Sequence, residues 1–338
     1  MTSPIPLEPQ LTVVVTTYNR FDSLASLLNS LFCQVECNSV KIIVADNCSD
    51  YNLEAALLQR LGPSKMESVE INTKKFNIGA LGNISNSFLL PNSKWMWLLS
   101  DDDITVPGSI ARVLSQIRSF PDALGFKFTD IGLDISPVYD RISVDSLPDL
   151  LNVVSSCKID LGNFIFMSNN IFNLDELRPY LIYAFTHSYT YVPHIIPLLM
   201  GVNDSRELIF FSDSIVKYQP PKILPNHDYF VSIYLGAMSI ADLPIKLGKS
   251  DFYRFVHYFK MNSFWILSKN FYYSSLGQRR YLYARIYSAV FKNNSSLALR
   301  STFALFILQH VLGTDVFSKT IENIKSFARG VRSLMASR

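Results

Sequence analysis

Residues 95–103 read WMWLLSDDD, an apolar run that ends in three consecutive carboxylates. The run from Trp95 to Leu99 predicts a buried strand, and the strands of an open α/β sheet present ligand sites beyond their carboxyl ends. Asp101, Asp102 and Asp103 repel one another unless a cation or a donor-rich ligand lies among them. A divalent cation, held by one or two carboxylates and by ligand phosphates, meets that need. The alternative is a solvated acidic turn that caps the next helix, and the carboxylates alone do not separate the two.

The chain has 338 residues, which is enough for a large core and for two domains. Its 49% hydrophobic and 17% charged residues lie within or near the range of globular proteins, on the hydrophobic side. No stretch of about 18 uncharged apolar residues occurs, so we expect no transmembrane helix. Residues 1–10 lack a basic n-region, so we expect no signal peptide and a cytoplasmic location. The four cysteines form no Cys-x-x-Cys motif, which argues against a zinc site.

Apolar strands alternate with helices along the first third of the chain. The pattern predicts strands at 11–16, 40–45, 67–71 and 95–99, and helices at 24–32, 53–61, 80–90 and 107–117. This alternation is typical of a doubly wound, mostly parallel α/β sheet.

The rest of the chain gives a weaker pattern and then a helical one. We expect strands at 125–128 and 162–171, and an apolar helical region at 180–200 that is broken near Pro193 and Pro197. Helices are expected at 229–238, 252–271, 278–292, 297–312 and 316–335. We therefore predict a domain at 1–228, with halves of about 11–115 and 116–228, and a helical, basic C-terminal region at 229–338.

Unusual polar residues follow each of the first four strands. They are Thr17, Tyr18, Asn19 and Arg20 after the first strand, Asp46 and Asn47 after the second, Asn77 after the third, and the three aspartates after the fourth. Because the carboxyl ends of parallel strands meet at one edge of a sheet, we expect these side chains to form one ligand site.

These loops resemble those of the inverting family 2 glycosyltransferases, whose nucleotide-sugar domain has the GT-A fold. The resemblance rests on the Thr-Tyr-Asn-Arg loop at 17–20, the acidic loop at 46–50, the spacing of Asn77, Gly79 and Asn83, and Ser100–Asp103 at the place of the metal motif. It spans roughly residues 11–115. The commonest metal motif reads Asp-x-Asp-Asp, so Ser100 departs from it, and Ser100-Asp101-Asp102 looks like a Thr-Asp-Asp variant.

The resemblance implies transfer of a sugar from a nucleotide-sugar donor to a hydroxyl of a saccharide acceptor, with inversion. It implies Mg2+ or Mn2+ at Asp102 and Asp103, because a divalent cation stabilises the charge of the departing diphosphate. The implied donor-binding residues are Thr17, Tyr18, Asn19, Arg20, Asp46, Asn77, Gly79, Asn83 and Asp101. The Asp46 carboxylate can accept from the imide N–H of uracil or thymine, which favours a UDP- or dTDP-linked donor; otherwise it caps the helix that begins near Leu53.

The family's usual general base, an aspartate some 80 to 100 residues after the metal motif, has no counterpart here, since residues 185–191 hold no carboxylate. His187 is the residue in that stretch with a suitable pKa, and it is one candidate for the catalytic base. Asp228 is the other. His187 could equally be a hydrogen-bonded histidine near the core and Asp228 a helix N-cap, and the sequence does not choose.

Two other classes of protein share some of these features. A sugar-1-phosphate nucleotidyltransferase would need a glycine-rich, basic loop after the first strand, which residues 17–20 lack. A non-catalytic nucleotide-sugar-binding protein is supported by the absent family base. We expect no nucleic-acid partner, because no recognition motif accompanies the basic residues.

Charge is distributed unevenly. Residues 252–338 hold 13 Lys and Arg against two acidic residues, together with many aromatic residues. Such a segment predicts contact with an anionic membrane surface, although helices with solvated basic faces would look the same. Bacterial members of the resembled family often extend lipid-linked saccharides, so we expect a peripheral protein at the inner face of the cell membrane with a lipid-linked acceptor.

Overall fold

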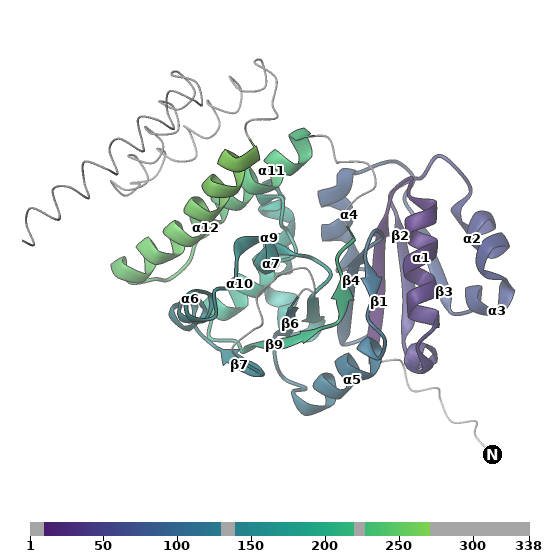
Figure 1. The fold of residues 1–338 in the computed structure, drawn as a ribbon, viewed down its shortest axis with the longest axis horizontal. Coiled ribbons are helices and arrows are strands. Elements are labelled where there is room, and N and C mark those ends of the chain that lie inside the picture. Colours follow the sequence, from purple (N-terminus) through teal and green to yellow (C-terminus); the bar gives the residue numbers. More distant parts are fainter. Residues whose placement is uncertain (1–9, 130–138, 220–226, 271–338) are drawn as a thin grey trace, which may run out of the picture. The chain divides into compact units, whose positions relative to one another are not determined.

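A computed structural model describes residues 10–129, 139–219 and 227–270 of the chain (Figure 1). Met1–Ser263 forms one compact unit and Phe264–Arg338 forms a second. The helices predicted at 278–292, 297–312 and 316–335 lie outside the described residues. Of the helices that are described, none combines the length and the apolar character needed to cross a membrane.

An eight-stranded sheet with the order β3-β2-β1-β4-β8-β6-β9-β7 forms the centre of the first unit. Its strands are β1 (Leu11–Thr17), β2 (Lys41–Asp46), β3 (Val69–Thr73), β4 (Trp95–Ser100), β6 (Gly125–Thr129), β7 (Arg141–Val144), β8 (Asn170–Asn173) and β9 (Leu208–Ser214). The first four strands are mutually parallel, whereas β8 and β7 are antiparallel to their neighbours. Strands β5 (Ile104–Thr105) and β10 (Val216–Lys217) form a separate ribbon. The predicted mostly parallel α/β sheet is confirmed.

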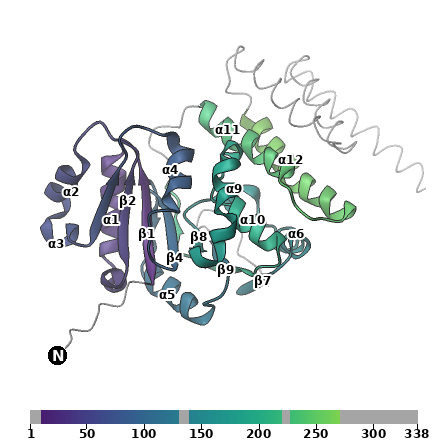
Figure 2. The ribbon, with the colours of Figure 1, turned by 180° about the vertical axis from the view of Figure 1, so that it is seen from behind.

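Helices lie on both faces of this sheet (Figures 1 and 2). The α-helices of the described residues are α1 (Phe21–Phe32), α2 (Leu53–Leu61), α3 (Pro63–Met66), α4 (Gly79–Ser87), α5 (Ser109–Ser119), α6 (Leu147–Ser156), α7 (Leu161–Ile165), α8 (Leu174–Leu177), α9 (Leu181–Thr186), α10 (Ile196–Asn203), α11 (His227–Met238) and α12 (Lys249–Asn270). Local chemistry sets several of their ends. Asn52 caps α2 by accepting from the Ala55 N–H at 3.0 Å, and Gly62, with φ +85°, ends it.

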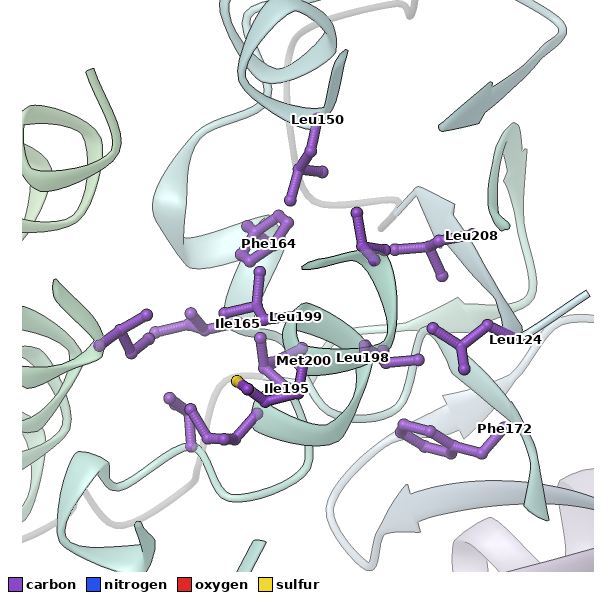
Figure 3. Packing of buried hydrophobic residues seen from close by; sticks show 14 of the residues in the cluster. Leu124, Leu150, Phe164, Ile165, Phe172, Ile195, Leu198, Leu199, Met200 and Leu208 are labelled. Atoms are coloured by element: carbon purple, nitrogen blue, oxygen red, sulfur yellow. The ribbon is translucent and has the colours of Figure 1, made fainter. Parts of the chain in front are cut away.

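The two faces of the sheet bury two separate apolar clusters because successive side chains of a strand point in opposite directions. On β1, Val13 and Val15 belong to the cluster that contains residues of α1, α2 and α5, while Val14 belongs to the cluster that contains residues of α6, α7 and α10. Figure 3 shows the second cluster, where Phe164, Leu198 and other residues of this face pack together. The strands that carry the candidate site are therefore anchored on both sides.

The segment 162–200 differs from the sequence-based expectation in one element and agrees with it in another. The strand predicted at 162–171 is wrong over most of its length, because Asp160 accepts from the Asn163 N–H at 3.0 Å and so starts helix α7; the strand β8 begins only at Asn170. The break predicted near Pro193 and Pro197 is present, since α9 ends at Thr186 and α10 begins at Ile196, with Pro197 in its first turn. A proline is favourable there because the N–H that it lacks would have no partner within the helix.

Candidate functional site

Strand register brings the predicted loops together at one edge of the sheet. Thr17 of β1 pairs with Asp46 of β2, and Thr16 pairs with Ser100 of β4. The chain proceeds from β1 to β2 on one side and reaches β4 on the other, so β1 lies at a topological switch point, where open α/β sheets bind ligands. A cavity of about 430 Å³ lies here, lined by Thr16, Thr17, Tyr18, Arg20, Asn47, Asn77, Gly79, Ala80, Asn83, Ile84, Ser100, Asp101 and Met167.

The charged part of the cavity lies between β1 and β4. Arg20 Nη1 donates to Asp101 Oδ1 at 3.1 Å and to Asp102 Oδ2 at 2.8 Å, and Thr17 Oγ1 donates to Asp101 Oδ2 at 2.6 Å. Burial raises the pKa of Asp101 to about 6, although Thr17 and Arg20 oppose the shift. Ser100 Oγ also donates to Asp102. The two carboxylates thus share the Arg20 guanidinium, a group that can also bind phosphate.

Asp103 points to a different partner. It is buried, and Ser168 Oγ donates to its Oδ2 at 2.5 Å, while the Ser100 N–H donates to the same hydroxyl at 2.9 Å. Neither Asp102 nor Asp103 is among the residues that line the cavity. In the described part of the chain, no group of three or more His, Cys, Asp and Glu side chains is arranged to hold a metal ion.

The part of the cavity next to β2 is lined by uncharged amides. Asn47 Nδ2 donates to Asn77 Oδ1 at 2.8 Å, and the N–H groups of Ile78 and Gly79 donate to Asn47 Oδ1 at 3.0 Å and to Asn77 Oδ1 at 2.7 Å. Gly79 has φ +78°, a conformation that favours glycine, at the start of α4. Asn83 is buried one turn further along α4, and its Nδ2 donates to the Ala45 carbonyl at 2.8 Å.

Two predicted donor-binding residues, Asn19 and Asp46, lie beside the cavity rather than in its lining. The Asn19 side chain donates to Asp50 Oδ2 at 2.7 Å and accepts from the Asp50 N–H at 2.9 Å, so it ties the loop after β1 to the loop after β2. Asp46 is buried, and its Oδ1 accepts from Ser49 Oγ at 2.6 Å and from the Ser49 N–H at 3.1 Å. Both residues therefore shape the loops that border the site.

Of the two candidate bases, the structure describes the side chain of His187 but only the backbone of Asp228. His187 follows α9, and its Nδ1 lies 2.9 Å from Thr186 Oγ1. Partial burial lowers its pKa, which keeps the imidazole neutral at pH 7. His187 does not line the cavity, but α9 contacts the cavity-lining helix α4 through Ser85 Oγ, which donates to the Ala184 carbonyl at 2.9 Å. Asp228 is the second residue of α11, and its side chain lies outside the described residues.

Several residues that shape the site were not predicted from the sequence. Met167 lines the cavity and Ser168 joins Ser100 to Asp103. The buried Lys127 of β6 donates to Asn169 Oδ1 at 2.9 Å and to Asn170 Oδ1 at 3.2 Å, which holds the same segment in place. A single lysine inside the apolar strand 125–129 was the available signal for Lys127.

Comparisons with known proteins agree with this geometry. The sequence pattern described as "Glycosyl transferase family 2" matches residues 12–155. No protein of curated function matches the chain by sequence.

Solved structures of the same architecture include residues 1–349 of TarS from S. aureus, with 14% sequence identity and a TM-score of 0.62 over 94% of this chain and 91% of that one. The same part of TarS in complex with UDP-GlcNAc has 13% identity and a TM-score of 0.63 over 94% and 92% of the two chains. The mannosyltransferase PcManGT from Pyrobaculum calidifontis, in complex with GDP-Man and Mn2+, has 14% identity and a TM-score of 0.53 over 98% and 89%. Identities this low speak for the fold alone. Together with the matched sequence pattern, they identify residues 12–155 as a glycosyl transferase family 2 domain in a glycosyltransferase with the GT-A fold.

Proposed function

We propose that this glycosyltransferase transfers a sugar from a UDP- or dTDP-linked donor to a hydroxyl of a saccharide acceptor, with inversion at the anomeric carbon. The observation that carries the proposal is the division of the cavity into a charged part, with Arg20 and Asp101, and an uncharged part lined by asparagine amides. A nucleoside diphosphate has the same division, because its phosphates are anionic and its base is neutral. The TarS complex with UDP-GlcNAc supports a nucleotide-sugar donor.

The residues at the charged part fit a divalent cation. Mg2+ is usually bound by one or two carboxylates, with ligand phosphates and water completing its shell, and Asp101 and Asp102 offer two. Of the two metal ligands predicted from the sequence, Asp102 is the more accessible, since 26% of its side chain is exposed whereas Asp103 is buried. A bound Mg2+ or Mn2+ would supply Lewis-acid stabilisation of the diphosphate as it leaves. Arg20 would bind and orient the same phosphates.

The acceptor hydroxyl must lose a proton as it attacks, so a general base is part of the proposal. We assign His187 to that role, because its neutral imidazole can accept a proton at pH 7 and because Thr186 and the rings of Tyr183 and Tyr189 surround it. Asp228 is the alternative. A lipid-linked acceptor is a further part of the proposal and rests on the basic segment at 252–338.

The test measures release of nucleoside diphosphate from a panel of UDP-, dTDP-, GDP- and CDP-sugars with saccharide acceptors and Mn2+. We expect turnover with a UDP- or dTDP-sugar, and loss of turnover in Asp102→Ala or in excess EDTA. The matched control is Asp122→Ala, whose carboxylate is 91% exposed and lies outside the cavity. Full activity of Asp102→Ala would refute the metal assignment.

The same assay separates the other classes. Formation of inorganic diphosphate from a nucleoside triphosphate and a sugar phosphate would identify a nucleotidyltransferase. A product whose anomeric configuration matches that of the donor sugar, seen by NMR, would contradict inversion.

A further inference from the structure

Asn83 lines the cavity and carries an acceptor atom that no group of the described residues satisfies. The residue is only 2% exposed, it lines the cavity, and its Nδ2 donates to the Ala45 carbonyl at 2.8 Å. A carbonyl oxygen can only accept, so this bond fixes the orientation of the amide and leaves Oδ1 as its free end. Within the described chain, Asn83 Oδ1 is buried and has no hydrogen-bond partner. An unpaired buried acceptor destabilises the fold, so its presence in a ligand cavity points to a ligand donor.

Asp46, the residue predicted from the sequence to accept from the nucleobase, is less suited to this task. It is 1% exposed, and its carboxylate accepts from the N–H and the hydroxyl of Ser49. It does not line the cavity. Its carboxylate already stabilises the loop after β2, whereas Asn83 Oδ1 has no hydrogen-bond partner among the residues that the structure describes.

The neighbours of Asn83 indicate which part of a donor lies there. Asn47 Oδ1 and Asn77 Oδ1 already accept from protein N–H groups, whereas Asn83 Oδ1 accepts from none in the described chain. These amides adjoin β2, and Arg20 and Asp101 lie on the other side of β1, next to β4. If the charged part binds the diphosphate, the uncharged part around Asn83 is left for the neutral base.

We propose that Asn83 Oδ1 accepts a hydrogen bond from a lactam N–H of the donor's nucleobase and thereby selects the nucleotide. The proposal rests on the proposed function, since it assumes a nucleotide-sugar donor. Uracil and thymine offer such a group at N3 and guanine offers it at N1, whereas the N3 of cytosine carries a lone pair instead of hydrogen. Asn83 thus favours UDP, dTDP or GDP over CDP. It is a specificity-determining residue that contacts the base.

Isothermal titration calorimetry on the full chain with Mn2+ tests this inference. The ligands are UDP and N3-methyl-UDP in one arm, and GDP and N1-methyl-GDP in the other, because methylation removes the donor hydrogen. We expect wild-type protein to bind the unmethylated member of one pair at least tenfold more tightly. In Asn83→Ala, which leaves room for the methyl group, that ratio should fall to about one.

Asn86→Ala is the matched control, because Asn86 lies on the same helix and does not line the cavity; it should keep the wild-type ratio. Equal affinities within both pairs in wild-type protein would overturn the inference without any variant, and so would an unchanged ratio in Asn83→Ala. Failure of every nucleoside diphosphate to bind would instead overturn the proposed function itself, and the inference with it.

Discussion

A substitution of Ser168 tests both the stability of the fold and the geometry of the carboxylates. The side chain is 0% exposed, its hydroxyl donates to Asp103 Oδ2 at 2.5 Å, and it accepts from the Ser100 N–H at 2.9 Å. Ser168→Ala removes a hydrogen bond to a charged group, worth about 1.5–3 kcal/mol, and a neutral one, worth about 1 kcal/mol. We therefore expect the free energy of unfolding to fall by about 3 kcal/mol.

Ser87→Ala provides a control that matches Ser168→Ala in chemistry and burial. Ser87 is also 0% exposed, but its hydroxyl donates at 2.8 Å to the Asn83 carbonyl, which lies within helix α4 and keeps its backbone hydrogen bond. Its removal should cost about 1 kcal/mol or less. Urea unfolding followed by far-UV circular dichroism measures both differences as shifts of the midpoint at constant slope.

The same variant, Ser168→Ala, also tests ligand binding at the site. Ser168→Ala should weaken binding of nucleoside diphosphate and Mn2+, because the turn from Ser100 to Asp103 loses the hydroxyl that joins its two ends. If Ser168→Ala costs no more than Ser87→Ala, Ser168 does not hold the carboxylate turn and the reasoning fails.

Three further predictions concern ionisation, the base and the membrane. The pKa of Asp101, about 6 in the folded chain and about 3.9 in an unfolded one, means that its contribution to stability is complete below pH 4 and is lost as pH rises through 6. Asp101→Asn should remove that part of the pH dependence of urea unfolding without added metal, and identical profiles of the two proteins would refute the buried-carboxylate account. His187→Ala should lower kcat at least a hundredfold while the calorimetric affinity for the donor nucleotide stays unchanged, since general-base catalysis contributes about 10²–10⁴-fold; a kcat within a few-fold of wild type would transfer the role to Asp228. The full chain should float with vesicles that contain anionic lipid, and salt should weaken this binding through screening; equal binding to neutral vesicles would contradict an electrostatic attraction by residues 252–338.

Regular hydrophobic patterns made the first half of the sheet predictable. Strands β1, β2 and β4 are buried apolar runs, and the predicted ranges differ from the observed ones by one or two residues. Strand β8 was not predicted correctly, because two of its four residues, Asn170 and Asn173, are buried amides. Asn173 Nδ2 is satisfied by the Ala123 carbonyl at 2.9 Å, a tertiary contact that no local pattern reveals.

The positions of the site residues along the chain could be predicted from the sequence, but their hydrogen-bond partners could not. Thr17, Arg20 and Asp101 could be grouped because each lies at or just after the end of a strand that meets the same edge. Whether a polar atom of the site already has a hydrogen-bond partner depends on residues far away in sequence. Asn83 is oriented by Ala45, 38 residues earlier, and Asp103 is held by Ser168, 65 residues later. Such long-range partners decide which acceptors are left for a ligand.

The ion pairs of Arg20 with Asp101 and Asp102 have a consequence for the order in which ligands bind. The two carboxylates already have an internal counter-ion in Arg20, with contacts of 3.1 Å and 2.8 Å. A divalent cation that arrives alone must compete with this guanidinium, so its affinity for the free protein should be low. A bound diphosphate should attract Arg20 away from the carboxylates and leave them available to the cation. Nucleotide and cation should therefore strengthen each other's binding by the same factor, as thermodynamic linkage requires.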